Sequence, residues 1–231
     1  MCLLCLGSDP PESVKGKGGR ADQFNKLLTL KDQPSEFAVG MKDACFKEPC
    51  CCLGAFLCVP TGVTACWARK KVLDTYHSGL SDYTCCQNYL TSTCCCCGVP
   101  KDCCKGNGCA LCIEGLCCPV FGVSVARMHL METKLIRPDP CDYQIIHCSN
   151  LLQCASCICT SAASILACVW NNPASDALAA FACIFDVLVD MCTCWVTGCM
   201  AAQIAHEVHV EAATKGPVVT QGPVAEGMIR A

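Results

Sequence analysis

The most regular hydrophobic pattern lies near the C-terminus, where two long apolar runs cover residues 143–170 and 177–205. The connector between them, Asn171-Asn-Pro-Ala-Ser-Asp176, is polar, and Ser175 or Asp176 is a suitable N-cap for the helix that follows. Each run is longer than the roughly 20 residues that a helix needs to cross a bilayer. The pattern predicts an apolar helical hairpin over residues 143–211.

This hairpin fits two environments. As a membrane pair it would be flanked by Arg137 and Lys215 on the side opposite the connector, which would leave both chain ends in the cytosol. Against spanning, Asp186 and Asp190 would lie near the bilayer midplane, where each costs about 2.5–3.5 kcal/mol unless it has a partner. These two aspartates form either a cation site or a hydrogen-bonded polar seam between helices, and a hairpin buried in protein remains an alternative to spanning.

Upstream, the apolar pattern predicts a helix over residues 54–73 and another over 121–136, which Pro138 and Pro140 should end. A short amphipathic helix is expected over residues 23–31. The triplet Arg69-Lys70-Lys71 is expected on a solvated helix face or beside a membrane. Apart from this triplet the chain has no cluster of cations near aromatic residues, so a nucleic-acid partner is not expected.

An internal repeat with a period of sixty residues covers the cysteine-rich middle of the chain. The second copy is centred on residues 109–127, with a weaker echo at residues 194–198. The first-copy residues and their second-copy equivalents are Cys52 and Cys112, Cys58 and Cys118, Gly62 and Gly122, Val63 and Val123, and Thr64 and Ser124.

The chain has 231 residues and 30 cysteines, a fraction above the roughly 8–10% that marks a disulfide scaffold in secreted proteins. The N-terminus lacks the cationic region of a signal peptide, and no Asn-x-Ser/Thr acceptor occurs. We therefore expect cytosolic exposure, where clustered cysteines more often hold metal than disulfides. Glycines and prolines between residues 98 and 108 break any long element, so these loops need metal or disulfide staples.

Zinc is the expected cofactor, because C-x2-C spacing delivers two thiolates from one short segment and occurs at Cys109/Cys112 and Cys154/Cys157. Buried free thiols are the alternative. Two exposed cysteines near the N-terminus, Cys2 and Cys5, are expected sites of reversible acylation or plain thiols. The predicted metal ligands are Cys85, Cys86, Cys103, Cys104, Cys109, Cys112, Cys118 and Cys141.

The expected fold is mainly α: cysteine-rich helical repeats, irregular stapled loops and the C-terminal hairpin. We divide the chain into a polar leader (1–44), a cysteine-rich repeat region (45–142), the hairpin (143–211) and a flexible tail (212–231). An enzyme is not expected. With 30 cysteines and five histidines some Cys/His pairing is inevitable, and the sequence has no phosphate-cradling glycine loop and no H-E-x-x-H motif.

Several motifs resemble the cysteine-rich family named after placenta-specific gene eight, which includes plant cell-number regulators and cadmium-resistance proteins. They are Cys118-Pro-Val-Phe-Gly122, Tyr83-x-Cys85-Cys86-Gln87, Pro138-x-Pro140-Cys141-Asp142 and Gly198-Cys-Met-x-Ala-Gln203, in a longer plant and protist branch. The resemblance covers roughly residues 45–205 and departs from the commoner Cys-Pro-Cys signature at Cys117-Cys118-Pro119. It implies a non-enzymatic protein of the membrane, usually the plasma membrane, linked to metal handling or growth control.

These observations lead to a membrane-associated, zinc-binding, metal-handling or adaptor protein that acts through protein partners or as a homo-oligomer, with no small-molecule substrate. One alternative is a structural subunit of a larger assembly stapled by disulfides or core thiols. Another is an oligomeric cation transporter that uses Asp186 and Asp190.

Overall fold

The computed structural model describes residues 30, 33–89, 104–137, 139–169 and 173–215, and confirms a mainly helical chain with two long apolar helices at its C-terminal end. The described residues contain no strand, only an isolated parallel bridge between Ser35 and Ile136. The predicted helix over 23–31 lies outside them, apart from Leu30. The helices are α2 (Met41–Lys47), α3 (Pro49–Cys58), α4 (Val63–Tyr76), α5 (Gly108–Cys117), α6 (Pro119–Lys134), α7 (Pro140–Val169) and α8 (Pro173–Lys215), with short 3-10 turns η1 (Val59–Thr61), η2 (Gly79–Asp82) and η3 (Cys85–Asn88).

Proline sets the starts of four of these helices. Pro49, Pro119, Pro140 and Pro173 are the first residues of α3, α6, α7 and α8, where the missing N–H is not needed and the fixed φ suits a helix. The α5 helix starts differently, because the Asn107 side chain accepts hydrogen bonds from two backbone amides of its first turn. The sequence therefore determines most helix starts locally.

The single helix predicted over residues 54–73 is wrong, because the chain breaks between α3 and α4. Pro60 lies in η1, and Gly62 follows it with a φ of +73°, which is costly for any residue with a side chain. A Cβ at Gly62 would also lie 2.5 Å from the carbonyl oxygen of Gly115 on α5. The helix predicted over 121–136 starts earlier, at Pro119, and ends at Lys134, where Leu135 takes the left-handed conformation.

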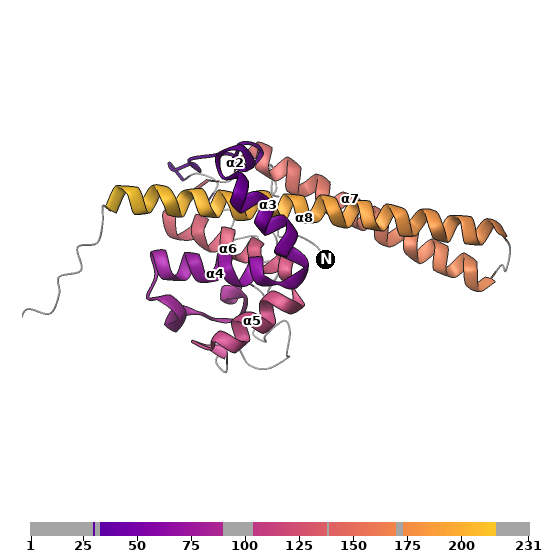
Figure 1. Cartoon of the computed structure of the whole chain (residues 1–231), viewed down its shortest axis with the longest axis horizontal. Coiled ribbons are helices and arrows are strands. Elements are labelled where there is room, and N and C mark those ends of the chain that lie inside the picture. The colour runs from indigo at the N-terminus through magenta and orange to yellow at the C-terminus, as the bar shows by residue number, and fades with distance from the viewer. Residues whose placement is uncertain (1–29, 31–32, 90–103, 138, 170–172, 216–231) are drawn as a thin grey trace, which may run out of the picture.

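The two copies of the sequence repeat lie on two short-then-long helix pairs, α3 with α4 and α5 with α6. The break differs between the pairs, since Gly62 precedes α4 whereas Gly122 lies inside α6. Both pairs change direction at the end of the cysteine-rich body from which the hairpin projects (Figure 1). The repeat itself stays a prediction.

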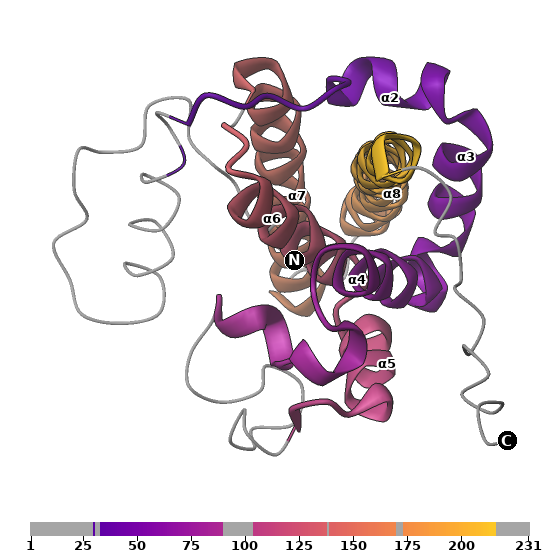
Figure 2. The ribbon, with the colours of Figure 1, turned by 90° about the vertical axis from the view of Figure 1, so that its left-hand side faces the viewer.

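The second half of α8 forms the centre of the body. Figure 2 shows α8 nearly end on, with α2 above it, α3 on its right, α4 below it, and α6 and α7 on its left. Residues 196–205 of α8 are all buried. The body closes around the second hairpin helix, which continues to Lys215.

A buried polar network holds α6, α7 and α8 together. Arg127 on α6 donates to Asp142 on α7 over 2.8 Å and to Gln203 on α8 over 2.7 Å. Gln203 donates in turn to Asp142 over 2.8 Å, and the Met41 amide of α2 donates to the same carboxylate over 2.7 Å. Because Arg127 and Asp142 are nearly inaccessible to solvent, each depends on the other for charge compensation.

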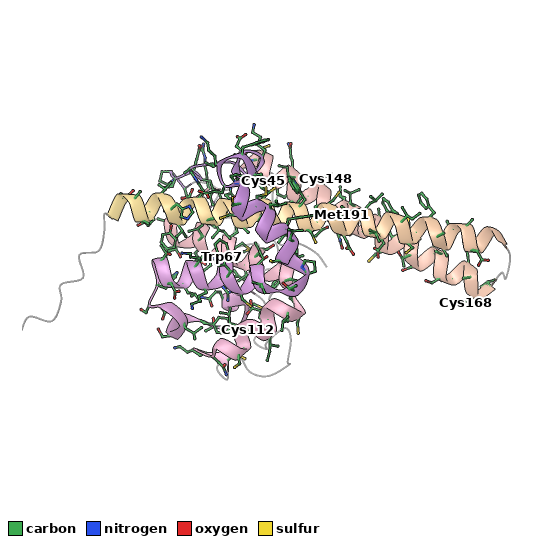
Figure 3. The ribbon with its side chains drawn as sticks, in the orientation of Figure 1. Cys45, Trp67, Cys112, Cys148, Cys168 and Met191 are labelled. Carbon is green, nitrogen blue, oxygen red and sulfur yellow. A yellow bond between two sulfur atoms is a disulfide. The ribbon has the colours of Figure 1, made fainter. Side chains whose placement is uncertain are left out.

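The second half of α7 and the first half of α8 form a hairpin that extends well beyond the body (Figure 1). Cys168 lies near its tip and Met191 near its base, whereas Cys45 and Trp67 belong to the body (Figure 3). The projecting segments, residues 151–169 and 177–195, are each about 28 Å long at 1.5 Å per residue. Both helices are long and apolar enough to cross a membrane. Only 11% of the most apolar stretch of α7 and 17% of that of α8 is buried.

Polar side chains form hydrogen bonds between the two helices of this hairpin. Ser156 on α7 donates to Asp186 on α8 over 2.6 Å, and Gln153 donates to Asp190 over 3.2 Å and to Thr193 over 3.0 Å. Large apolar side chains are also exposed on the hairpin. They are Leu151, Ile158, Ile165, Val169, Phe181, Ile184, Val187, Leu188 and Met191.

Candidate metal centre

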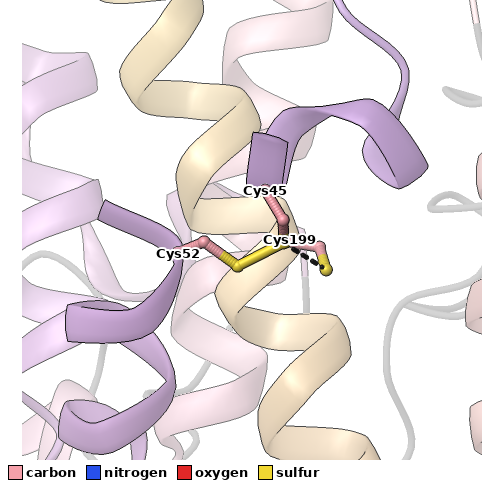
Figure 4. The surroundings of a disulfide bond; sticks show 3 residues. All are labelled: Cys45, Cys52 and Cys199. Carbon is pink, nitrogen blue, oxygen red and sulfur yellow. Dashed lines mark hydrogen bonds between the residues drawn. A yellow bond between two sulfur atoms is a disulfide. The ribbon is translucent and has the colours of Figure 1, made fainter. Parts of the chain in front are cut away.

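Three sulfur atoms converge where α2, α3 and α8 meet. Cys45 and Cys52 form a disulfide, and the Sγ of Cys199 lies 3.1 Å from the Sγ of Cys45 (Figure 4). Cys52 and Cys199 are buried and Cys45 is half-buried. We call these three residues the sulfur cluster. Its ligand atoms lie within 4.8 Å of one another, so one ion could contact all three.

The backbone brings these sulfurs together at a sharp corner. Helices α2 and α3 meet at an angle of 107° at Glu48, which precedes Pro49. Cys45 and Cys52 lie on either side of this corner, and α8 passes through it. Gly198 lets α3 come close, because a Cβ there would lie 2.9 Å from the Cys52 carbonyl oxygen. The small residue thus places its neighbour Cys199 beside Cys52.

The cluster has two chemical states. As a disulfide, Cys45 and Cys52 clamp the corner of α2 and α3. Two electrons and two protons convert this bond into two thiols, which gives three thiols with Cys199. Thiolate sets of this kind favour zinc and other soft metal ions, with a fourth position open to water or another ligand.

Glu48, at the corner between α2 and α3, also contacts two histidines of α8 that follow Cys199. Glu48 Oε1 lies 2.9 Å from Nδ1 of His209 and 3.3 Å from Nδ1 of His206. The hydrogen bond with His209 contributes most to lowering the pKa of Glu48 below its usual range. The corner is therefore held against α8 by a polar contact as well as by sulfur.

A second group that could hold a metal consists of Cys85, Cys86 and Glu114, all buried. Its carboxylate already has partners. Tyr83 donates to Glu114 Oε2 over 2.8 Å and the Cys86 amide donates over 3.0 Å, while Arg69 Nε lies 3.5 Å from Oε1. A guanidinium this close repels an incoming dication, so this group suits metal less well than the sulfur cluster.

This second group corrects one expectation. Arg69 was expected on a solvated face with its two neighbouring lysines, but it is 1% exposed and paired with Glu114. Lys70 and Lys71 do lie at the surface. Burial and the neighbouring carboxylate raise the pKa of Tyr83, which keeps its hydroxyl protonated as a donor to Glu114.

The predicted zinc ligands lie in several places. Cys85, Cys86 and Cys104 share one buried cluster, and Cys103 lies outside the described residues. Cys109 and Cys112 are exposed on α5, Cys118 lies between α5 and α6, and Cys141 is exposed at the start of α7. Within the described ranges, neither group suited to a metal includes any of these last four.

Cys112 does meet another thiol, that of Cys66 on α4. Burial, reinforced by the neighbouring Cys112, raises the pKa of Cys66 to about 11. Such a thiol is largely protonated at neutral pH and is a poor ligand and nucleophile. The two predicted acylation sites, Cys2 and Cys5, lie outside the described residues.

Asp186 and Asp190 lie on the side of α8 that contacts α7. Each accepts a hydrogen bond from a different α7 side chain, Ser156 and Gln153 respectively. No described group that could hold a metal contains either aspartate. The contacts are those of the polar seam that the sequence offered as one alternative.

Sequence reasoning missed the sulfur cluster. Cys45 and Cys52 are seven residues apart, which is two helical turns, but Pro49 lies between them and conceals their common face. Cys199 directly follows the weak third echo of the repeat, which ends at Gly198. The signal that could have identified it is this glycine next to a cysteine on an otherwise apolar helix.

Comparisons with known proteins add no relative. No family model, no curated protein and no solved structure matches this chain.

Proposed function

We propose that this chain is a membrane-anchored metal-binding protein, in which α7 and α8 cross the bilayer and the sulfur cluster binds one soft metal ion, zinc in particular. One observation carries the proposal: α8 supplies both an apolar surface of membrane length and one of three converging sulfurs. The bound metal would thus lie in the body at the base of the membrane hairpin.

The distribution of side chains on the hairpin supports insertion. Large apolar side chains cover the outside of the hairpin, and Asp186 and Asp190, although exposed, each accept a hydrogen bond from α7, as a carboxylate in hydrocarbon would need. Each projecting segment is about 28 Å long, close to the roughly 30 Å hydrocarbon thickness. The seam gives Asp186 and Asp190 hydrogen-bond donors, which offsets part of their insertion cost.

Reduction would switch the cluster to its metal-binding state. In the cytosol, glutathione and thioredoxin keep most cysteines as thiols, and zinc displaces the thiol protons when it binds. We place the body on the cytosolic side on this ground. The resemblance noted above suggests the plasma membrane and a role in metal handling or as an adaptor for protein partners or further copies of the chain, by binding and not by catalysis.

Metal content tests the cluster. The chain is purified in detergent under reducing conditions, loaded with zinc, desalted and measured by elemental analysis. Replacing Cys45, Cys52 and Cys199 by serine should remove about one zinc per chain. The matched control replaces three exposed α7 cysteines, Cys148, Cys154 and Cys168, and should keep that zinc. Equal zinc in both triple variants would refute the site.

A separate experiment tests the hairpin. Lysine replaces Ile158 and Ile165, which are 69% and 64% exposed. On a water-exposed helix this change is nearly neutral, whereas in a bilayer each lysine costs about 2.5–3.5 kcal/mol. We expect the variant to be released from membranes by alkaline carbonate while the parent is retained. A Val210→Lys control, on α8 and outside the projecting segments, should stay membrane-bound.

A second candidate function is a structural subunit clamped by disulfides, and the Cys45–Cys52 bond favours it. Rapid alkylation of cells before lysis, followed by mass spectrometry, separates the two. Alkylated Cys45 and Cys52 support metal binding, whereas a disulfide-linked peptide pair from the cytosolic protein supports the clamp. The transporter alternative gains nothing from the geometry, because Asp186 and Asp190 accept hydrogen bonds within the seam.

A further inference from the structure

An open pocket of about 650 Å³ lies between the corner of α2 and α3 and the base of the hairpin. The sulfur cluster lines its inner part together with apolar side chains of α2, α3, α7 and α8. Lys42 is the one lining side chain that carries a charge. The pocket therefore suits a hydrophobic ligand with a negative group at one end.

The mouth of this pocket is made of large, exposed apolar side chains. Phe46 is 85% exposed, Leu53 is 54% exposed and Trp195 is 49% exposed. Contiguous surfaces of this kind usually mark a place where protein or membrane makes contact. Here the surface runs on into the hairpin, because Met191, one turn before Trp195 on α8, is also exposed and lies on the projecting part (Figure 3).

This continuity identifies the occupant. Trp195 lies where the projecting segment of α8 enters the body, the level at which tryptophans gather at a membrane interface. An acyl chain that lies along the hairpin reaches the pocket without crossing water. Lys42 on α2 offers a positive charge to an anionic headgroup at the same level.

We propose that the pocket binds an acyl chain of an anionic phospholipid from the bilayer that holds the hairpin. The proposal rests on the membrane part of the proposed function and is independent of metal binding. A bound chain would cover the exposed side chains of Phe46 and Leu53 and close off the sulfur cluster from water on that side.

Quenching of Trp195 fluorescence by brominated lipids tests the proposal. Trp67 and Trp170 are replaced by phenylalanine, which leaves Trp195 as the single tryptophan of the full chain. The protein is held in detergent micelles and titrated with phosphatidylserine brominated on its acyl chain, or with brominated phosphatidylcholine. Micelles keep the lipid dilute, so a specific site saturates whereas random collision does not.

We expect saturable quenching, with phosphatidylserine effective at a lower mole fraction than phosphatidylcholine. Lys42→Glu should raise the half-saturating fraction of phosphatidylserine about fivefold, whereas Lys47→Glu, the same change outside the pocket lining, should not. Leu53→Glu at the mouth should abolish saturation, and Leu57→Glu, also exposed on α3 but outside the lining, should preserve it.

Quenching that rises in proportion to lipid, equally for both headgroups and in every variant, would overturn the proposal. That outcome is separate from failure of the proposed function, which is measured by zinc content and carbonate extraction. A chain that resists extraction but shows only proportional quenching has a membrane hairpin without a lipid site.

Discussion

Replacing Asp142 by alanine should destabilise the body severely. The carboxylate is 1% exposed and accepts three hydrogen bonds, from the Arg127 guanidinium, the Gln203 side chain and the Met41 amide. Alanine removes all three acceptor contacts and leaves a buried guanidinium without its counter-charge. Removing one partner of a buried ion pair costs about 3–5 kcal/mol, a large part of the 5–15 kcal/mol that stabilises a typical domain.

The measurement is the free energy of unfolding in detergent, followed by circular dichroism in increasing denaturant. Asp43→Ala, an exposed aspartate in the first turn of α2, serves as the control and should change stability by less than about 0.5 kcal/mol. The double variant Arg127→Met with Asp142→Asn removes both charges together and should cost less than Asp142→Ala alone. A loss below about 1 kcal/mol for Asp142→Ala would refute the assigned role of the network.

Two further changes test the packing and the polar contact at the corner. Gly115→Ala would place a Cβ 2.5 Å from the Cys66 sulfur and 2.8 Å from the Gly62 carbonyl oxygen, so it should lower the free energy of unfolding by about 1–3 kcal/mol. The control is Gly54→Ala, because a Cβ there has nothing within 4 Å. This change should raise the free energy of unfolding by about 0.5–1 kcal/mol in the same assay. Because the pKa of Glu48 is lowered in the folded chain, its stabilisation is present above the ordinary glutamate pKa and is lost as pH falls through the lowered value. The protection of the α2 and α3 amides against hydrogen exchange, taken relative to the intrinsic exchange rate at each pH, should therefore fall on acidification. Glu48→Gln should remove this dependence, and an unchanged profile would count against the contact.

The parts of the fold that depend on local pattern were predictable from sequence. Two runs of apolar residues around a polar connector predict the hairpin, and prolines at four helix starts mark boundaries that need no tertiary information. The break at Gly62 was missed because the apolar pattern continues through it. Its cause is a contact with Gly115, fifty-three positions away in sequence, that only the folded chain reveals.

The chemistry was harder to predict because it depends on which cysteines meet. The closely spaced Cys109 and Cys112 were predicted to bind zinc, but both lie exposed on one helix. The converging sulfurs come from α2, α3 and α8, up to 154 residues apart in sequence. Likewise Asp142 and Gln203 belong to separate motifs, yet the structure joins them through Arg127, which neither motif contains.

The uninterrupted course of α8 has a mechanical consequence. One rigid rod runs from the hairpin tip into the centre of the body, so the rod transmits any rotation or tilt imposed at its outer end. Cys199 belongs to α8, whereas Cys45 and Cys52 belong to the shorter helices α2 and α3 that pack around it. On the proposed membrane topology, a change in bilayer thickness that tilts α8 would alter the spacing of the three sulfurs and so the affinity of the proposed metal site.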